Sequence, residues 1–431
     1  MKVSLSRVAA FEILFRIESE GEMSGSLLPE YESSLDMIDR GLCHELVLGS
    51  LRKQMMLDRE INHLTKDKKV DLEVRIALRL GLYQIRYLDR IPDHSAINES
   101  VELVKLKRKK SAAGFVNAIL RRSTRERFVP SYKNELDRIS IETSHPTKLI
   151  EHWTRAFGAD RAELIAKANN ERRPISFRST ANTNSDDLQL IEKFRHSEFE
   201  GSYVSDSFSR ELSDLSENGK IYFQEIGSQL VARSVPIQDG HSFLDLCAAP
   251  GSKTTAVAVR TRNVSDFRIV ANDNSPKRLE FLVKNAAQQG LDNIHTFHFD
   301  AEKEVPDELG SFDTILIDAP CSGTGTVGHN PEIRYRINAA EIARHADRQL
   351  NILRNASDVV NVGGVIIYST CSLELEENED VCGAFLGQNL EFEICDLDFP
   401  TRFRCENGFY RTWPDTDKMD GFFVAGLRKA V

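Results

Sequence analysis

A mainly apolar run that ends in a carboxylate and a thiol constrains the fold of this chain most. Residues 312–317 have the composition of a strand buried on both faces of a parallel sheet, and Asp318 and Cys321 follow where this strand ends. A second such run, residues 364–369, is followed by Cys371. Because open α/β sheets bind ligands at the carboxyl ends of their strands, we expect both thiols at one sheet edge.

Strands and helices alternate from about residue 219 onward, which is typical of an α/β domain with a mostly parallel sheet. Seven strands are expected, at 242–247, 268–272, 294–299, 312–317, 364–369, 391–396 and 421–427. The intervening helices are expected near 253–261, 276–289, 338–361 and 376–388. The last strand follows a loop and not a helix, so it is predicted to run antiparallel to the others.

The N-terminal part, residues 1–128, is predicted to be entirely helical, because its apolar residues recur at helical spacing. The net charge of the chain is −10, but this segment holds 23 Lys and Arg against 19 Asp and Glu. Its basic run, residues 105–110, is by itself typical of a solvated helix end. It indicates a phosphate-contacting patch only if the rest of the chain handles RNA.

Residues 129–218 are predicted to form a linker and a small α+β subdomain, ahead of the α/β domain at 219–431. The polar stretch 127–140 is the expected linker, and a helical pair is expected over 144–171. A β-α-β pattern then occupies residues 175–204. The arginines of this segment are candidate RNA contacts, although most surface arginines have no such role. They are Arg172, Arg173, Arg178, Arg195 and Arg210.

The seven cysteines are odd in number and form no CxxC pair, which argues for reduced thiols and against a disulfide framework or a zinc site. The N-terminus lacks the apolar core of a signal peptide, and no uncharged apolar run approaches the ~20 residues that a membrane span needs. These features predict a cytoplasmic protein without membrane contact or a bound metal, and we expect a monomer.

A strand, a tight turn and a helix start follow one another over residues 243–254. Small residues in the turn let a ligand approach the backbone closely, and the helix N-terminus favours a carboxylate. Acids follow the next three strands, where doubly wound sheets hold groups such as ribose hydroxyls. Each aspartate alone could merely cap a turn. Together, the turn with Ala248, Ala249 and Gly251 and the acids Asp273, Asp300 and Asp318 indicate a cofactor pocket at this edge.

Three motifs, at 245–254, 318–325 and 368–379, resemble the signatures of RNA (cytosine-5) methyltransferases of the NOL/NOP/Sun family. Residues 1–128 resemble a NusB-like RNA-binding domain, through the stretches 6–14, 39–49, 78–85, 96–102 and 114–122. The chain is therefore similar throughout to the RsmB/Fmu/Sun type. Two departures are Ser252, where the family usually has a second glycine, and the lack of the family's basic residues near 328–329.

This resemblance implies a Rossmann-like class I methyltransferase domain with S-adenosylmethionine as its cofactor. The cofactor-binding residues that it implies are Cys247, Ala248, Ala249, Pro250, Gly251, Ser252, Lys253, Asp273, Asp300 and Asp318. The implied substrate is small-subunit ribosomal RNA, methylated at C5 of a cytosine of the position-967 type. The NusB-like segment implies contact with RNA or ribonucleoprotein.

The resemblance also implies different roles for two cysteines. Cys371 would add to C6 of the cytosine, so that C5 becomes nucleophilic enough to take the methyl group. Cys321 would assist release of the product, and Asp318 would hold the protonated N3 edge of the base. A cysteine at a strand end is most often a small buried hydrophobe, and we keep that interpretation for the other cysteines. These are Cys43, Cys382, Cys395 and Cys405, with Cys247 expected to pack in the cofactor turn.

Two other functions are left open by the sequence. The chain could be a noncatalytic RNA-binding assembly factor with a vestigial cofactor fold, although the intact Cys321, Cys371, Asp318 and Lys253 count against this. It could also methylate a protein or a small molecule, but that function gives no reason for paired thiols.

Overall fold

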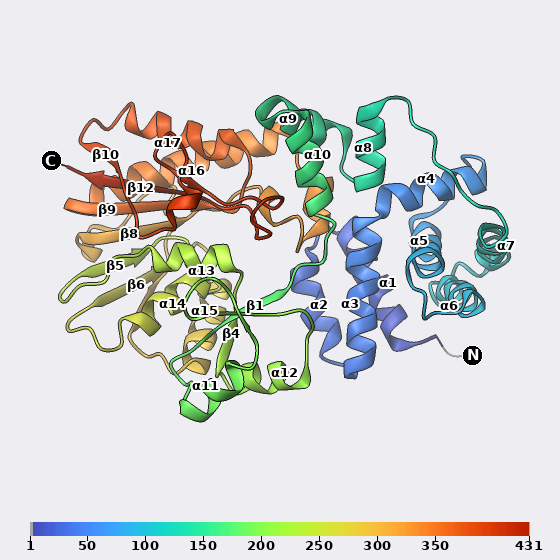
Figure 1. Ribbon diagram of the computed structural model, residues 1–431, viewed down its shortest axis with the longest axis horizontal. Coiled ribbons are helices and arrows are strands. Elements are labelled where there is room, and N and C mark those ends of the chain that lie inside the picture. The colour runs from blue at the N-terminus through green and yellow to red at the C-terminus, as the bar shows by residue number, and fades with distance from the viewer. Residues whose placement is uncertain (1–2, 431) are drawn as a thin grey trace. The chain divides into compact units, whose positions relative to one another are not determined.

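The computed structural model describes residues 3–430, which divide into two compact units (Figure 1). The first unit runs to Asn170 and also includes His329–Arg336. The second unit comprises Glu171–Gly328 and continues from Ile337. Within the described residues, no helix is both long and apolar enough to cross a bilayer.

The first unit is helical. Its helices are α1 (Leu5–Ser19), α2 (Ser24–Glu32), α3 (Met37–Arg52), α4 (Gln54–Thr65), α5 (Leu72–Tyr87), α6 (Asp93–Leu106), α7 (Ala113–Ser123), α8 (Glu135–Thr143), α9 (Thr147–Phe157) and α10 (Ala159–Ala168). A short 3-10 turn, η1 (Lys110–Ala112), precedes α7. Apolar residues of α1–α7 form one continuous core, so the helical prediction for the N-terminal part is confirmed.

The predicted linker is shorter than expected, because α8 already begins at Glu135. Asn134 caps this helix, since its side chain accepts a hydrogen bond from the Asp137 N–H. The predicted helical pair is confirmed as α9 and α10. All three helices belong to the first compact unit, so the units divide at a different place from the predicted domains. The domain boundaries at residues 128 and 218 stay predictions.

A short segment from the C-terminal half of the sequence, η4 (Pro331–Tyr335), also belongs to the first unit. Its Arg334 is fully buried and donates to the Thr143 carbonyl at 3.0 Å and to the Asn170 Oδ1 at 2.8 Å. The Tyr335 hydroxyl donates to the Leu51 carbonyl at 2.9 Å. These bonds satisfy carbonyls at the ends of α3 and α8, and no periodicity in the sequence predicts them.

The second unit contains a small antiparallel sheet in the order β2-β3-β1-β4. Its elements are β1 (Ile175–Ser179), α11 (Ser185–Ile191), β2 (Arg195–His196), β3 (Ser202–Ser205), α12 (Arg210–Glu217) and β4 (Ile221–Phe223). The expected β-α-β segment is present here, with α12 and β4 as additions.

The expectation that Arg178 contacts RNA is wrong, because its side chain is buried. It donates to the Gln224 Oε1 and to the Thr255 Oγ1, each at 2.8 Å. Burial lowers the pKa of this guanidinium to about 10. Arg195 and Arg210 are exposed, but each has a nearby aspartate partner.

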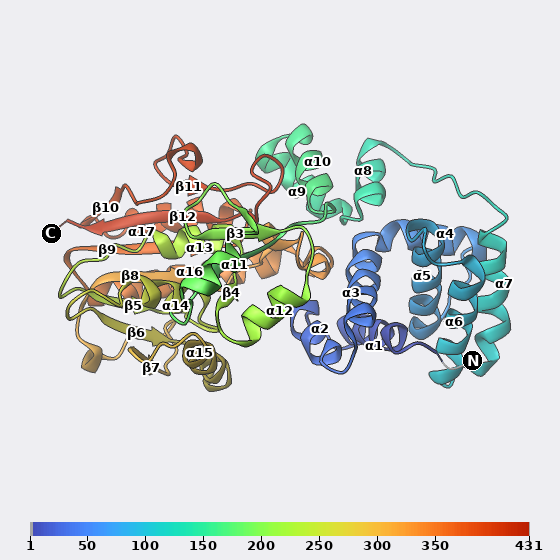
Figure 2. The same ribbon diagram turned by 60° about the horizontal axis from the view of Figure 1, so that its bottom comes forward.

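The large sheet of the second unit has the order β10-β12-β9-β8-β5-β6-β7, with β11 paired to β12. Its strands are β5 (Ser242–Asp245), β6 (Arg268–Asn272), β7 (Ile294–Phe297), β8 (Phe312–Asp318), β9 (Val360–Thr370), β10 (Phe392–Cys395), β11 (Tyr410–Arg411) and β12 (Phe423–Lys429). Strands β9, β8, β5, β6 and β7 run parallel to one another, and β12 is antiparallel to both β9 and β10. All seven expected strands and the antiparallel last strand are confirmed (Figure 2).

Helices cover both faces of this sheet. They are α13 (Ile226–Arg233), α14 (Ser252–Arg260), α15 (Pro276–Gln288), α16 (Ala339–Val359) and α17 (Glu379–Leu386). Neighbouring residues of one strand alternate between the two faces: Phe243 packs in the cluster with α13 and α14, and Leu244 in the cluster with α16 and α17. The parallel strands are thus buried on both faces, and their polar residues collect at the strand ends.

Candidate active site

The carboxyl ends of β5, β6, β8 and β9 meet at one edge of the large sheet. Asp245 is paired in register with Leu316 of β8 and with Ala271 of β6, and Asp318 is paired with Ser369 of β9. This register brings the segments that follow all four strands to the same edge. The predicted convergence of both thiols and the acids at that edge is present in the structure.

The turn between β5 and α14 is tight. The Ala248 N–H donates to the Asn272 carbonyl at 2.8 Å, and the Gly251 N–H donates to the Ala248 carbonyl at 2.7 Å. Gly251 has φ +101°, and a Cβ there would lie 2.9 Å from the Leu282 Cγ. Both the conformation and the close approach therefore require glycine at this position. Ser252, which occupies the position of the family's usual second glycine, begins α14 as a regular helical residue.

Two of the predicted acids have contrasting environments. Asp273 is buried, and its carboxylate accepts from the Ser275 N–H at 3.0 Å and from the Ala249 N–H at 3.3 Å. It therefore ties the end of β6 to the tight turn. Asp300 has a side chain 38 % exposed and lies 3.2 Å from the Lys303 ammonium. Asp300 lies at the same edge, but it is more exposed than Asp273 and its contacts are with its own loop.

Asp245 is a site residue that the sequence reasoning did not single out. Its Oδ2 accepts from the Thr254 hydroxyl at 2.7 Å, while its Oδ1 is buried and has no hydrogen-bond partner among the described residues. Burial raises the pKa of this carboxyl to about 7. Asp245 could have been predicted as a site residue from the sequence, because it is the last residue of the strand that leads into the tight turn.

Lys253 and Asp318 form a close ion pair at the centre of the edge. The Lys253 Nζ lies 2.5 Å from the Asp318 Oδ2, and the Ser369 hydroxyl donates to the Asp318 Oδ1 at 3.0 Å. Burial of Lys253 lowers its pKa, but the Asp318 carboxylate more than offsets this, so the pKa is raised overall. The pair therefore keeps the ammonium of the buried Lys253 charged at the centre of this edge.

The Cys321 and Cys371 sulfurs lie 3.4 Å apart, although the two residues belong to different loops. A hydrogen bond to Cys371 and burial raise the pKa of the Cys321 thiol. Cys321 is thus held as a thiol, and either sulfur can donate the hydrogen bond that joins the two residues. Cys43, Cys382 and Cys395 are buried, as expected, whereas the expectation for Cys405 is wrong because it is only partly buried. Burial also raises the pKa of the Cys247 thiol.

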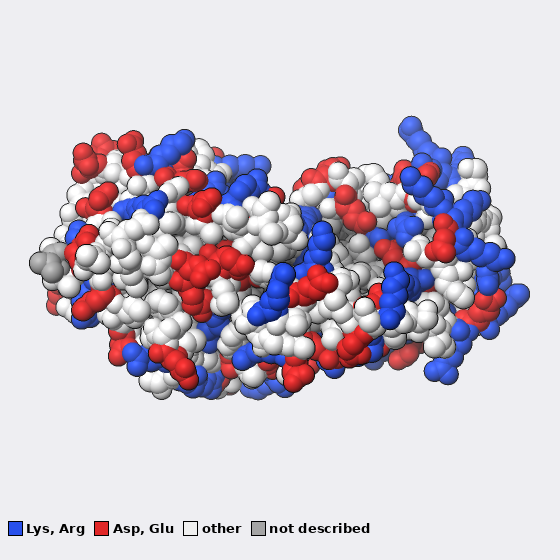
Figure 3. Space-filling view, turned by 90° about the horizontal axis from the view of Figure 1, so that it is seen from above, with Lys and Arg blue, Asp and Glu red and all other residues white. Residues whose placement is uncertain are grey.

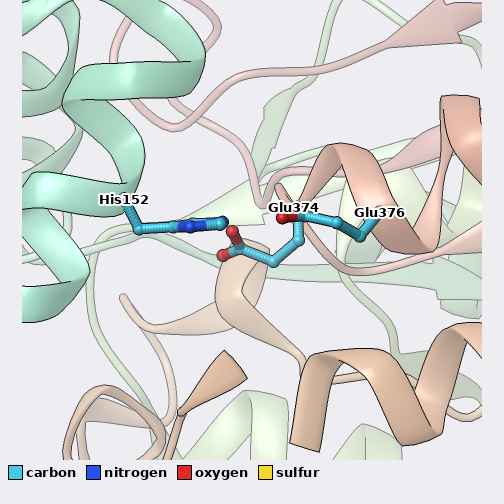
Figure 4. A group of neighbouring side chains, drawn as sticks. All are labelled: His152, Glu374 and Glu376. Atoms are coloured by element: carbon cyan, nitrogen blue, oxygen red, sulfur yellow. The ribbon is translucent and has the colours of Figure 1, made fainter. Parts of the chain in front are cut away.

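Hydrogen bonds cross between the two cysteine loops. The Gly325 N–H donates to the Cys371 carbonyl at 2.9 Å, and the hydroxyls of Ser322 and Ser372 lie 3.0 Å apart. Glu377, on the turn η5 (Leu375–Glu377), accepts from the Ser322 N–H at 3.0 Å. Figure 4 labels Glu374 and Glu376 on this same segment after β9. Ser322 and Glu377 are absent from the predicted site residues, although both lie inside the motifs.

Two protein families match this chain. The NusB family matches residues 4–125, and the family "16S rRNA methyltransferase RsmB/F" matches residues 233–428. A probable ribosomal RNA small subunit methyltransferase B of Bacillus subtilis is 33 % identical over 452 aligned positions, covering 100 % of both chains. This chain belongs to the ribosomal RNA small subunit methyltransferase B family. The Escherichia coli (strain K12) member is 28 % identical and covers 98 % of each chain.

Two solved structures have a similar fold. The crystal structure of PH0851 has a TM-score of 0.85 at 25 % identity and covers 100 % of both chains. A methyltransferase homolog protein from Pyrococcus horikoshii has a TM-score of 0.59 at 27 % identity, over 69 % of this chain and 99 % of its own. This member of the methyltransferase B family is therefore an S-adenosylmethionine-dependent methyltransferase acting on ribosomal RNA.

Proposed function

We propose that this protein methylates C5 of a cytosine in small-subunit ribosomal RNA through a covalent bond between Cys371 and C6 of that base. The observation that carries the proposal is the 3.4 Å separation of the Cys321 and Cys371 sulfurs, next to the Lys253–Asp318 pair. Family resemblance favours a target of the position-967 type. A monomeric state and a cytoplasmic location stay predictions.

The strand-end residues suit S-adenosylmethionine as the methyl donor, which supplies the transferred methyl group. The unpartnered Oδ1 of Asp245 can accept a hydrogen bond from an ammonium, and Asp273 lies where doubly wound folds hold ribose hydroxyls. The turn Cys247–Lys253 provides small residues and a helix N-terminus for close approach of a carboxylate. Asp300 and Asp318 complete the proposed set.

The thiol pair suits a reaction with separate attack and release steps. A Cys371 thiolate bonds to C6, and the resulting enamine makes C5 nucleophilic. After methyl transfer, the C5 proton is lost to a base and the C6–sulfur bond breaks, which restores the ring and frees Cys371. Asp318 would hold the protonated N3 of the base, and Cys321 would assist the elimination. The target base must leave its stack to reach these groups.

Denaturing gel electrophoresis of single variants with substrate RNA and cofactor tests this proposal. Cys321→Ala should accumulate a covalent protein–RNA complex, because attack remains possible while release is slow. Cys371→Ala should form neither the complex nor methylated RNA, and Cys405→Ala should behave as the unaltered protein. If Cys371→Ala and not Cys321→Ala accumulates the complex, then Cys321 is the attacking residue and Cys371 assists release. Bisulfite sequencing of the ribosomal RNA identifies the cytosine.

We further propose that the N-terminal helical unit binds RNA through exposed cations, which we call the basic edge. Figure 3 shows Lys and Arg side chains gathered over this unit, at the right of the view. Lys109 lies 2.8 Å from Asp71, so the loops after α4 and α6 are adjacent, and the Lys68 ammonium lies 5.6 Å from the Phe115 ring of α7. The basic edge consists of Lys66, Lys68, Lys69, Arg108 and Lys110, all exposed.

A further inference from the structure

The Glu377 carboxylate is buried beside the backbone of Cys321. Its side chain has 0 % exposure, and its two oxygens lie 3.0 Å and 3.3 Å from the Ser322 N–H. Among the described residues, no Lys or Arg forms an ion pair with Glu377. Burying a carboxylate without a cation is unfavourable, and burial indeed raises the pKa of this group to about 7. The oxygens of Glu377 are therefore satisfied by hydrogen bonds and not by a counter-charge.

A second buried side chain holds the other side of Cys321. The Gln349 Nε2 on α16 donates to the Pro320 carbonyl at 3.0 Å and lies 3.5 Å from the Glu377 Oε2. The peptide groups before and after Cys321 are thus each bonded to one of two buried neighbours that contact each other. A cysteine side chain has one rotatable bond to its sulfur, so a fixed backbone restricts where the Cys321 sulfur can lie.

The Glu377 backbone is itself fixed relative to Cys371. The Tyr368 hydroxyl donates to the Glu377 carbonyl at 2.6 Å, and the Asn378 Nδ2 donates to the Ser372 carbonyl at 2.9 Å. The segment that follows Cys371 therefore folds back and presents the Glu377 carboxylate to the Cys321 loop. Glu377 connects the loops of the two thiols through a side chain.

We propose that Glu377 is a positioning residue, which holds the Cys321 loop so that the Cys321 thiol meets the Cys371 sulfur during release of the methylated base. This inference rests on the proposed covalent reaction. Because Glu377 bonds the Cys321 loop and not Cys371 itself, it is expected to affect elimination and to leave attack on C6 unaffected.

Three substitutions at Glu377 separate a positioning role from a role of its charge. Glu377→Gln keeps the length of the side chain and one carbonyl oxygen for the Ser322 N–H. Glu377→Asp keeps the carboxylate, but its side chain is one methylene group shorter, so the acceptor lies farther from the Ser322 N–H. Glu377→Ala removes the acceptor. Gln349→Met removes the donor to the Pro320 carbonyl while it preserves volume, and so tests the other side of the same loop.

Single-turnover reactions with RNA and cofactor, resolved by denaturing electrophoresis, measure adduct formation and adduct release separately. The Asp, Ala and Met variants should release product about tenfold or more slowly, as expected for one buried hydrogen bond, and should accumulate the adduct. Their adduct formation should match the unaltered protein, and Glu377→Gln should release product at nearly the normal rate.

Three results would overturn the inference. Normal release by both Glu377→Ala and Glu377→Asp would exclude positioning. Normal release by Glu377→Asp with slow release by Glu377→Gln would assign the effect to charge. Equal loss of adduct formation and adduct release would show that the substitutions act on Cys371 or on folding. If Glu377→Ala does not fold, Glu377→Asp and Gln349→Met test the positioning role without it. Cys321→Ala is run in parallel: if it traps no adduct, the covalent scheme itself is wrong.

Discussion

The Lys253 ammonium lies 2.5 Å from the Asp318 carboxylate, although 65 positions separate the two residues in the sequence. The contact exists because β5 and β8 are neighbours in the sheet, so the helix that follows β5 and the end of β8 meet. Lys253 is buried, and the aspartate keeps its ammonium charged against the effect of burial. Asp318 therefore has a structural partner in addition to any contact with a base.

Asp318→Asn should abolish most methyl transfer and also reduce stability, because the buried Lys253 ammonium loses its counter-charge. The side chain of Asp318 is 31 % exposed, so we expect a loss of about 1–3 kcal/mol in the free energy of unfolding, less than for a fully buried pair. Urea unfolding and a methyl-transfer assay measure the two effects. Asp313→Asn is the matched control, since Asp313 lies on the same strand but bonds the Ser242 N–H at 2.9 Å. Methyl transfer lost equally in both variants would contradict the local role of Asp318.

Asp273→Ala should weaken binding of S-adenosylmethionine by about 1.5 kcal/mol or more, because it removes a buried acceptor and the bonds that hold the tight turn. Asp300→Ala should have a smaller effect, since Asp300 is more exposed and bonds mainly within its own loop. Isothermal titration calorimetry of the cofactor measures both affinities. Unchanged affinity for Asp273→Ala would remove Asp273 from the proposed cofactor site.

Asp245→Asn should change how stability depends on pH. The folded-state pKa of Asp245 is raised to about 7, above its ordinary value of 3.8, so its contribution is fully present below about pH 4 and is lost as the pH rises through 7. The amide cannot ionise, and its oxygen can still accept from the Thr254 hydroxyl. Without cofactor, the variant should be more stable than the unaltered protein at pH 8, and the difference should vanish near pH 4. Thermal unfolding across this range measures it, and parallel curves would show that Asp245 does not titrate there.

Neutralising the basic edge should weaken RNA binding and flatten its dependence on salt. Arg108→Gln with Lys110→Gln should lower the slope of log affinity against log salt by about 1–2, if each cation contacts one phosphate. Lys105→Gln is the control, because Lys105 lies in the same basic run but is paired with Glu102 at 2.6 Å. Filter binding at several salt concentrations measures the slopes. Equal slopes for the unaltered protein, the double variant and Lys105→Gln would show that the basic run is an ordinary solvated helix end without phosphate contacts.

Local patterns in the sequence determined the strands and helices of the second unit. Strands such as 268–272 were predictable because burial on both faces demands continuous apolar residues, and the helix near 276–289 has its cap at Ser275. The convergence of Cys321 and Cys371 was also predictable, since parallel strands end at the same sheet edge.

The sequence by itself thus determined the elements and the identity of the polar groups at the strand ends, whereas the division into two compact units differs from the three predicted parts. Only the tertiary structure decided which groups bond: Lys253 to Asp318, Glu377 to the Ser322 N–H, and the buried Arg178 to Thr255. It also decided that Asp245 has an unpartnered oxygen. Periodicity in the sequence indicates on which face of a helix or strand a residue lies. These hydrogen bonds join atoms that are far apart in the chain, so they form only when the sheet and its helices have packed.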